Sequence, residues 1–218
     1  MKRRSTYTSR GRYPFFARKL ANVVVWAERN HIPPLFFTTW AFIFSFVVAC
    51  ALAFAQVIPY QLYVFFGILF LVCLRLTSSW LDRALLKSRY VTHPKAGISH
   101  EVGDRLSDLA IFVGLFIGAP EHLRIWVLAA CVASFLPSVI SLWGMSRGAK
   151  RVRGGPFGMY GRSFTVAFVG LVLAGGMGQI SEWIFLFLMC LMIAGGLFTV
   201  EARISGINAS LKKVEAVR

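Results

Sequence analysis

The sequence predicts an all-α integral membrane protein, and three observations support this fold class. Of the 218 residues, 57% are hydrophobic, and the mean hydropathy is +0.65, whereas soluble domains contain roughly 45–50% apolar residues. Apolar runs of about 18 residues or more recur, which is the helix length that crosses a hydrocarbon core about 30 Å thick. These runs do not alternate polar and apolar residues, so they do not resemble the strands of a transmembrane barrel.

The basic residues are distributed as membrane topology requires. The chain has 24 Lys and Arg against 9 Asp and Glu, a net charge of +15, and the basic residues gather at alternate ends of the apolar runs. Cytoplasmic loops carry such an excess, so we expect both termini on the cytoplasmic side of the inner membrane. A nucleic-acid-binding protein would instead show a basic stripe on one folded face. Membrane lipids and phosphorylated substrates are therefore the expected partners, and nucleic acid is not.

The N-terminal part divides into a tail and an amphipathic helix. Residues 1–13 form a basic cytoplasmic tail. In residues 14–33, apolar side chains recur at helical spacing among charged ones, a pattern suited to a helix that lies in the membrane interface. A soluble helix packed on a cytoplasmic loop would show the same pattern. Pro33 and Pro34 end this helix.

A six-helix membrane domain is predicted for residues 34–205, and a basic C-terminal tail for residues 206–218. The loops expected outside the cell contain a single basic residue, Arg124. Gly114 and Gly118 form a GxxxG motif, which allows close helix packing within the chain or across a dimer. The six expected spans are residues 35–56, 61–82, 104–119, 122–145, 163–179 and 182–202.

All three aspartates of the chain, Asp82, Asp104 and Asp108, fall in one short stretch beside these spans. Carboxylates near a bilayer are costly and usually have a functional or pairing reason to be there. His100 precedes Asp104 and Asp108 at intervals of four residues, so the three side chains line one face of a helix. Oxygen ligands with an imidazole suit Mg²⁺ or Mn²⁺, which substrate phosphates commonly complete. We therefore expect these four residues to bind a divalent metal.

The alternative for the same carboxylates is ion pairing at helix ends with Arg83, Lys87 and Arg105, since a carboxylate near a helix start is stabilised in any case. A further arginine, Arg75, lies inside the second predicted span. We expect it either to extend toward the membrane surface or to pair with an acidic residue.

The aspartate-containing stretch resembles the signature of the CDP-alcohol phosphatidyltransferases, D-x-x-D-G-x-x-A-R followed after about eight residues by G-x-x-x-D-x-x-x-D. Its first part falls on residues 79–87 and its second on residues 96–104, without a gap. Asp82 and Asp104 are identical to the aspartates of the signature at these positions, and Lys87 keeps the positive charge of the signature's arginine. In an alternative register, Asp104 and Asp108 take the positions of the two aspartates in the second part of the signature. Where the family has Asp, Gly and Asp, this chain has Ser79, Arg83 and His100.

The resemblance implies a homodimeric enzyme of phospholipid synthesis. Such an enzyme transfers the phosphatidyl group of CDP-diacylglycerol to an alcohol acceptor with release of CMP, and it needs a divalent metal. In the preferred register Asp104 is the general base, and Asp82 and His100 are metal ligands. The resemblance further implies that substrate phosphates bind to Lys87, Arg153 and Arg162.

Two other functions remain open at this stage. One is a catalytically inactive family member that binds lipid or nucleotide as the partner of another membrane protein. The other is a small transporter, although the chain lacks evident inverted repeats.

Overall fold

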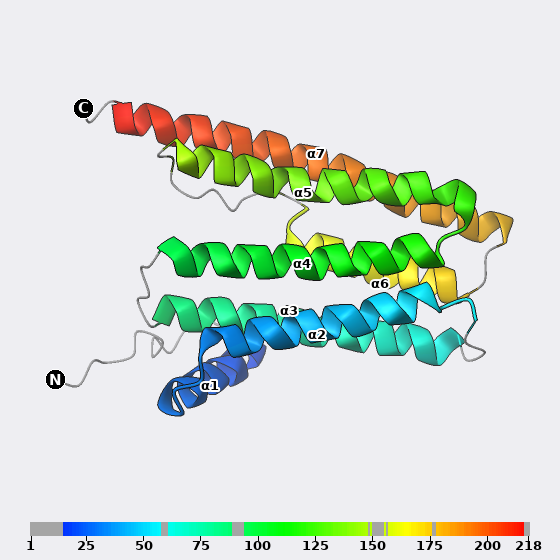
Figure 1. Cartoon of the computed structure of the whole chain (residues 1–218), viewed down its shortest axis with the longest axis horizontal. Helices are drawn as coiled ribbons and strands as arrows, with labels where there is room; N and C mark the ends of the chain where they lie inside the picture. Colours follow the sequence, from blue (N-terminus) through cyan, green and yellow to red (C-terminus); the bar gives the residue numbers. More distant parts are fainter. Residues whose placement is uncertain are drawn as a thin grey trace.

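The computed structural model describes residues 15–57, 61–88, 94–147, 149, 155, 157–175 and 178–215, and throughout this part of the chain the regular structure is helical (Figure 1). The all-α fold class is therefore confirmed. The helices are α1 (Phe15–Arg29), α2 (Pro34–Ala53), α3 (Gln61–Ser88), α4 (Pro94–Gly118), the short η2 (Glu121–Leu123), α5 (Arg124–Ser146), α6 (Met159–Ala174) and α7 (Gln179–Glu215).

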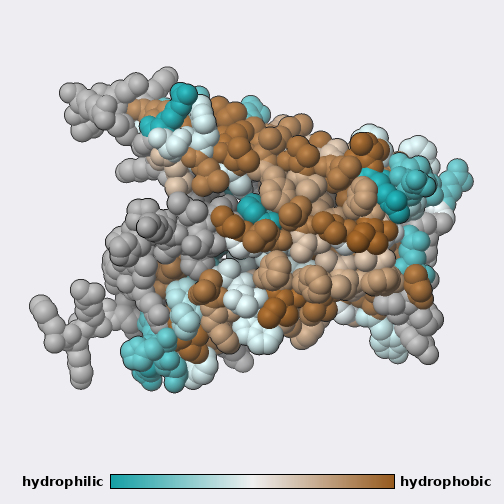
Figure 2. All heavy atoms as spheres, in the orientation of Figure 1, coloured by the Kyte–Doolittle hydropathy of each residue, from teal (hydrophilic) through white to brown (hydrophobic). Residues whose placement is uncertain are grey.

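Four of these helices, α2, α3, α5 and α7, contain a stretch long and apolar enough to cross a membrane. They coincide with four of the six predicted spans, and the chain is a helical membrane protein. Much of the bundle's side in Figure 2 is apolar, as expected of a surface that faces lipid. The apolar part of α6, Tyr160–Ala174, is shorter, and the first 15 residues of α4 contain five charged residues. That α4 and α6 also cross the bilayer stays a prediction.

The helices extend beyond the apolar segments from which the spans were predicted. α3 continues to Ser88 and α4 begins at Pro94, so most of the polar connection expected between residues 82 and 104 is helical. α7 continues to Glu215, which makes most of the expected C-terminal tail helical too. Hydropathy marks only the part of a helix that lipid surrounds, whereas Lys, Arg, Leu and Ala sustain a helix in water as well.

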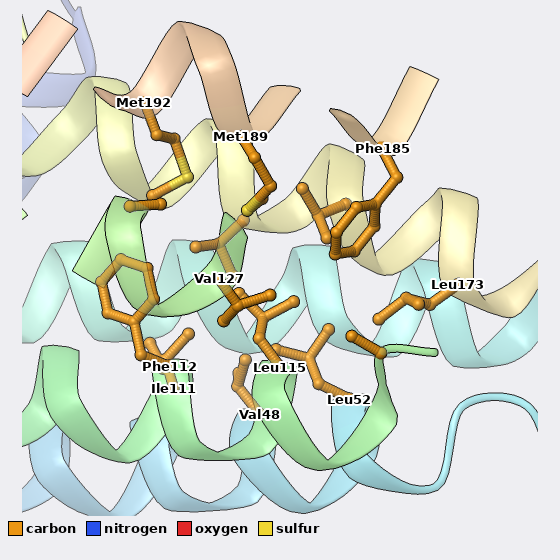
Figure 3. Close-up of a cluster of buried hydrophobic side chains, with 14 of the residues drawn as sticks. Val48, Leu52, Ile111, Phe112, Leu115, Val127, Leu173, Phe185, Met189 and Met192 are labelled. Carbon is orange, nitrogen blue, oxygen red and sulfur yellow. The ribbon is translucent and has the colours of Figure 1, made fainter. Parts of the chain in front are cut away.

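The helices pack around one apolar core. α2 packs against both α3 and α4, α5 packs against α7, and α6 packs against α3. Figure 3 shows buried side chains from α2, α4, α5, α6 and α7 pointing toward one another. The labelled members of this core are Val48, Leu52, Ile111, Phe112, Leu115, Val127, Leu173, Phe185, Met189 and Met192.

The first helix is present where the sequence predicts an amphipathic helix. Val24 and Ala27 of α1 are buried against the C-terminal part of α3, whereas Trp26 is exposed. One face of α1 is thus covered by protein and another is free to contact lipid headgroups. Its position in the membrane interface stays a prediction.

The GxxxG motif of α4 serves packing within the chain. A Cβ atom added at Gly114 would overlap the backbone of Ala49 on α2, and one added at Gly118 would overlap the carbonyl oxygen of Leu52. The absence of side chains at both positions therefore lets α2 and α4 approach closely along their length.

We predict that Gly114→Ala destabilises the protein, because the new methyl group has no room and pushes α4 away from α2. Overpacking of this kind costs about 1–3 kcal/mol. Gly67→Ala on α3 is the matched control, since nothing lies within 4 Å of its added Cβ. Thermal unfolding of the purified proteins in detergent measures the difference. Equal midpoints for the two variants would contradict the close α2–α4 contact.

Candidate functional site

The buried carboxylate of Asp108 on α4 lies among three guanidinium groups. Its Oδ1 atom pairs with Arg75 of α3. Its Oδ2 atom pairs with Arg105 at 2.9 Å and with Arg162 of α6 at 3.2 Å. Arg75 and Arg162 are themselves only 2% and 8% exposed. We call these four residues the Asp108 cluster.

The same arginines hold further polar groups. Arg75 donates through Nη1 to the Ser163 hydroxyl at 2.9 Å, and Arg162 donates through Nη1 to the backbone carbonyl of Ser134 on α5 at 2.6 Å. Buried charges are tolerated only when paired and hydrogen-bonded. The Asp108 cluster therefore ties α3, α4, α5 and α6 together at one level of the bundle.

Asp104, one helical turn before Asp108 on α4, contacts residues of the first part of the signature on α3. Its Oδ2 atom pairs with Arg83 of α3 at 2.5 Å, and its Oδ1 atom lies 3.4 Å from the Ser79 hydroxyl, which donates to it. Asp82 is buried on α3, one turn after Ser79. We call Ser79, Asp82, Arg83 and Asp104 the signature cluster. The two parts of the predicted motif thus face each other across α3 and α4.

The remaining predicted site residues are placed only in part. The side chains of Lys87 and His100, and the whole of Arg153, lie outside the described residues. Within the part of the chain that the structure describes, no three His, Cys, Asp or Glu side chains are grouped closely enough to hold a metal ion. Arg162, expected to bind a substrate phosphate, pairs with Asp108 in this structure, and its binding of phosphate stays a prediction.

The segment before α6 is anchored on α7 and so helps to place Arg162. The backbone N–H of Phe157 donates to the Thr199 hydroxyl at 3.1 Å, and that hydroxyl donates to the Gly195 carbonyl at 2.8 Å. A Cβ at Gly195 would overlap the Phe157 ring. Gly195 therefore provides the space in which this segment docks before α6 begins.

The sequence pointed to Arg75 as an unusual charge within an apolar span but did not identify its partner. The structure shows that Asp108 is that partner, and that Ser163 completes the contact. Ser134 contributes through its backbone carbonyl, which no side-chain pattern can reveal. The sequence carried two signals of this pairing. One was an arginine inside an apolar segment, and the other was the alternative that the aspartates pair with Arg83 and Arg105, as Asp104 and Asp108 do.

No protein-family model and no curated protein matches this chain. Solved structures do match it, among them the phosphatidylinositol phosphate synthase of Mycobacterium tuberculosis in complex with manganese and citrate. That structure is 19% identical, with a TM-score of 0.64 over 88% of this chain and 90% of the synthase chain. A second structure of this synthase, with CDP-diacylglycerol bound, is 20% identical to this chain and has a TM-score of 0.63. The match covers 87% of this chain and 94% of the synthase chain. The likeness shows that the chain has this synthase's fold.

We predict that Asp108→Asn strongly lowers the free energy of unfolding, because it leaves the buried charges of Arg75 and Arg162 without a counter-charge. Breaking a buried pair in this way costs about 3–5 kcal/mol. Asp104→Asn is the matched control, since its partner Arg83 is exposed and such pairs contribute about 0–1 kcal/mol. Denaturation of both variants in detergent measures their free energies of unfolding. Equal losses in the two variants would contradict the prediction that Asp108→Asn costs more.

Proposed function

We propose that this chain is a member of the CDP-alcohol phosphatidyltransferase family that transfers the phosphatidyl group of CDP-diacylglycerol to an alcohol. The observation that carries the proposal is the contact of Asp104 on α4 with Ser79 and Arg83 on α3. The signature resemblance requires its two parts to meet in space, and they do. The fold shared with a synthase whose structure holds CDP-diacylglycerol supports the same function.

The proposed arrangement in the membrane follows from the charge distribution. Six spans, with α4 and α6 among them, place both termini and the signature cluster on the cytoplasmic side of the inner membrane. α1 lies in the interface beside α3. A cytosolic acceptor and the nucleotide headgroup of the lipid then reach the cluster from the same side. As the family resemblance implies, the chain would act as a homodimer.

In the proposed reaction the Asp104 carboxylate accepts the proton of the acceptor hydroxyl. The acceptor oxygen forms a bond to the β-phosphorus of CDP-diacylglycerol, and the bond from that phosphorus to the bridging oxygen breaks, so CMP leaves with that oxygen. A positioned general base accelerates such a step by about 10²–10⁴-fold. Lys87 and Arg153 are proposed to bind substrate phosphates, and Arg162 to hold α6 against Asp108.

The resemblance also implies a pair of divalent cations, Mg²⁺ or Mn²⁺, held by four aspartates. The donors described here do not fit such a pair. Ser79 offers a neutral hydroxyl where the signature has a carboxylate, and one oxygen of Asp104 is paired with Arg83. Both oxygens of Asp108, which the sequence placed among the metal ligands, contact guanidinium groups. We therefore assign no step of the transfer to a metal.

A specific observation favours a second candidate function, a family member that binds nucleotide or lipid without catalysis. The Arg83 guanidinium pairs with the carboxylate proposed as the base, and the oxygen that it occupies is not free to contact an acceptor hydroxyl. Such a protein would bind CDP-diacylglycerol and present it to a partner in the membrane.

One assay separates the two functions. The purified chain is given CDP-diacylglycerol and a panel of alcohol and phosphorylated alcohol acceptors, with Mg²⁺, Mn²⁺ or EDTA, and CMP release is measured. We expect release with at least one acceptor, and a loss of about 10²-fold or more in Asp104→Asn. Glu182→Gln, a carboxylate at the start of α7 near His122, is the control and should retain activity.

Absence of CMP with every acceptor, together with identical results for wild type and Asp104→Asn, would overturn the transfer reaction. Binding of cytidine nucleotide by that same inactive protein would then support the second candidate.

A further inference from the structure

The described charges at the site add up to an excess of positive charge. Within the described residues, the signature cluster and the Asp108 cluster together contain three carboxylates and four guanidinium groups. An intact signature would have aspartates at residues 79 and 100 and a glycine at residue 83. This chain therefore carries three units of charge more in the positive direction than the signature prescribes.

Such surroundings disfavour a divalent cation. Mg²⁺ and Mn²⁺ are bound by oxygen donors that are mostly anionic, and the Coulomb repulsion from neighbouring guanidinium groups is strong where water is scarce. For Asp104 to bind a metal through Oδ2, it would first have to release Arg83. The same surroundings attract an anion.

Arg83 is placed to bind that anion. Its side chain is 41% exposed, whereas the Asp104 side chain beside it is 14% exposed, so the guanidinium group is the more accessible of the pair. A guanidinium group binds phosphate oxygens through two parallel N–H donors.

We infer that the signature cluster binds the diphosphate of its cytidine nucleotide directly through Arg83, in place of the divalent cations that the signature implies. This inference rests on the proposed function, because the diphosphate is that of CDP-diacylglycerol. The two phosphates carry the negative charge that the cluster lacks, and Arg83 supplies the positive charge that a metal would otherwise bring.

The same exchange of partners releases Asp104 from its ion pair with Arg83. When the guanidinium group of Arg83 turns from the carboxylate to the diphosphate, the Oδ2 atom of Asp104 loses its partner and becomes free to accept a hydrogen bond from the acceptor hydroxyl. Nucleotide binding thus exposes the base to the acceptor, whereas in the empty protein the Arg83–Asp104 pair holds the carboxylate in place.

The test measures binding of radiolabelled CDP to the full chain in detergent, once with EDTA and once with Mn²⁺. We expect the two affinities to agree within about threefold, and Arg83→Gln to weaken binding at least tenfold in EDTA. Arg83→Lys, which keeps a positive charge but not the paired donors, should lie between them. Arg147→Gln, an exposed arginine that stacks on Trp143 at the end of α5, controls for a general loss of positive charge.

Each outcome decides the inference. CDP binding that appears only with Mn²⁺, or that Arg83→Gln leaves unchanged in EDTA, overturns it and leaves the proposed function standing. No CDP or CDP-diacylglycerol binding in either buffer overturns both. Size-exclusion profiles and helical circular dichroism matching wild type confirm that the variants are folded.

Discussion

Burying Arg75 and Arg162 among apolar helices requires a counter-charge for each, and Asp108 serves both. A carboxylate with two oxygens accepts from several donors at once, so one residue of α4 fixes an arginine of α3 and another of α6. The hydrogen bond from Arg162 to the Ser134 carbonyl adds α5 to the same level of the bundle. Because unpaired charges are so costly here, α3 and α4 have little freedom to slide past each other.

The position of the signature cluster follows from that constraint. Asp104 lies one turn before Asp108 on α4, and Ser79 lies one turn after Arg75 on α3, so the contact at one level brings the residues of the next level face to face. Arg83 is one turn further along α3 and closes the contact with Asp104. The Asp108 cluster thus fixes the register of α3 against α4, and this register positions the signature cluster, the proposed nucleotide site. The inference that this site binds a diphosphate in place of a pair of cations rests on its residues Ser79 and Arg83.

The sequence predicted the helices well because their apolar runs have the length that a membrane demands. It placed the ends of α3 and α7 too early and the start of α4 too late, since hydropathy falls where a helix leaves the lipid although the helix continues. Residue spacing also predicted that the two parts of the signature would lie together, as Ser79 and Asp104 do. The spacing did not predict the pairing of Asp108. It places Asp104 and Asp108 on one face of α4, but only the helix opposite decides that one meets Arg83 and the other meets Arg75.

In the proposed site, α3 and α4 are held together through Asp108 and Arg83 faces the diphosphate of the nucleotide. An experimental structure of the full chain with CDP bound, determined in EDTA, tests it most directly. We expect the diphosphate to lie within hydrogen-bond distance of the Arg83 guanidinium group, between α3 and α4, while Asp108 keeps Arg75 and Arg162 as partners. A nucleotide bound away from these helices, or one that contacts the protein between them with Arg83 still paired to Asp104, would contradict it.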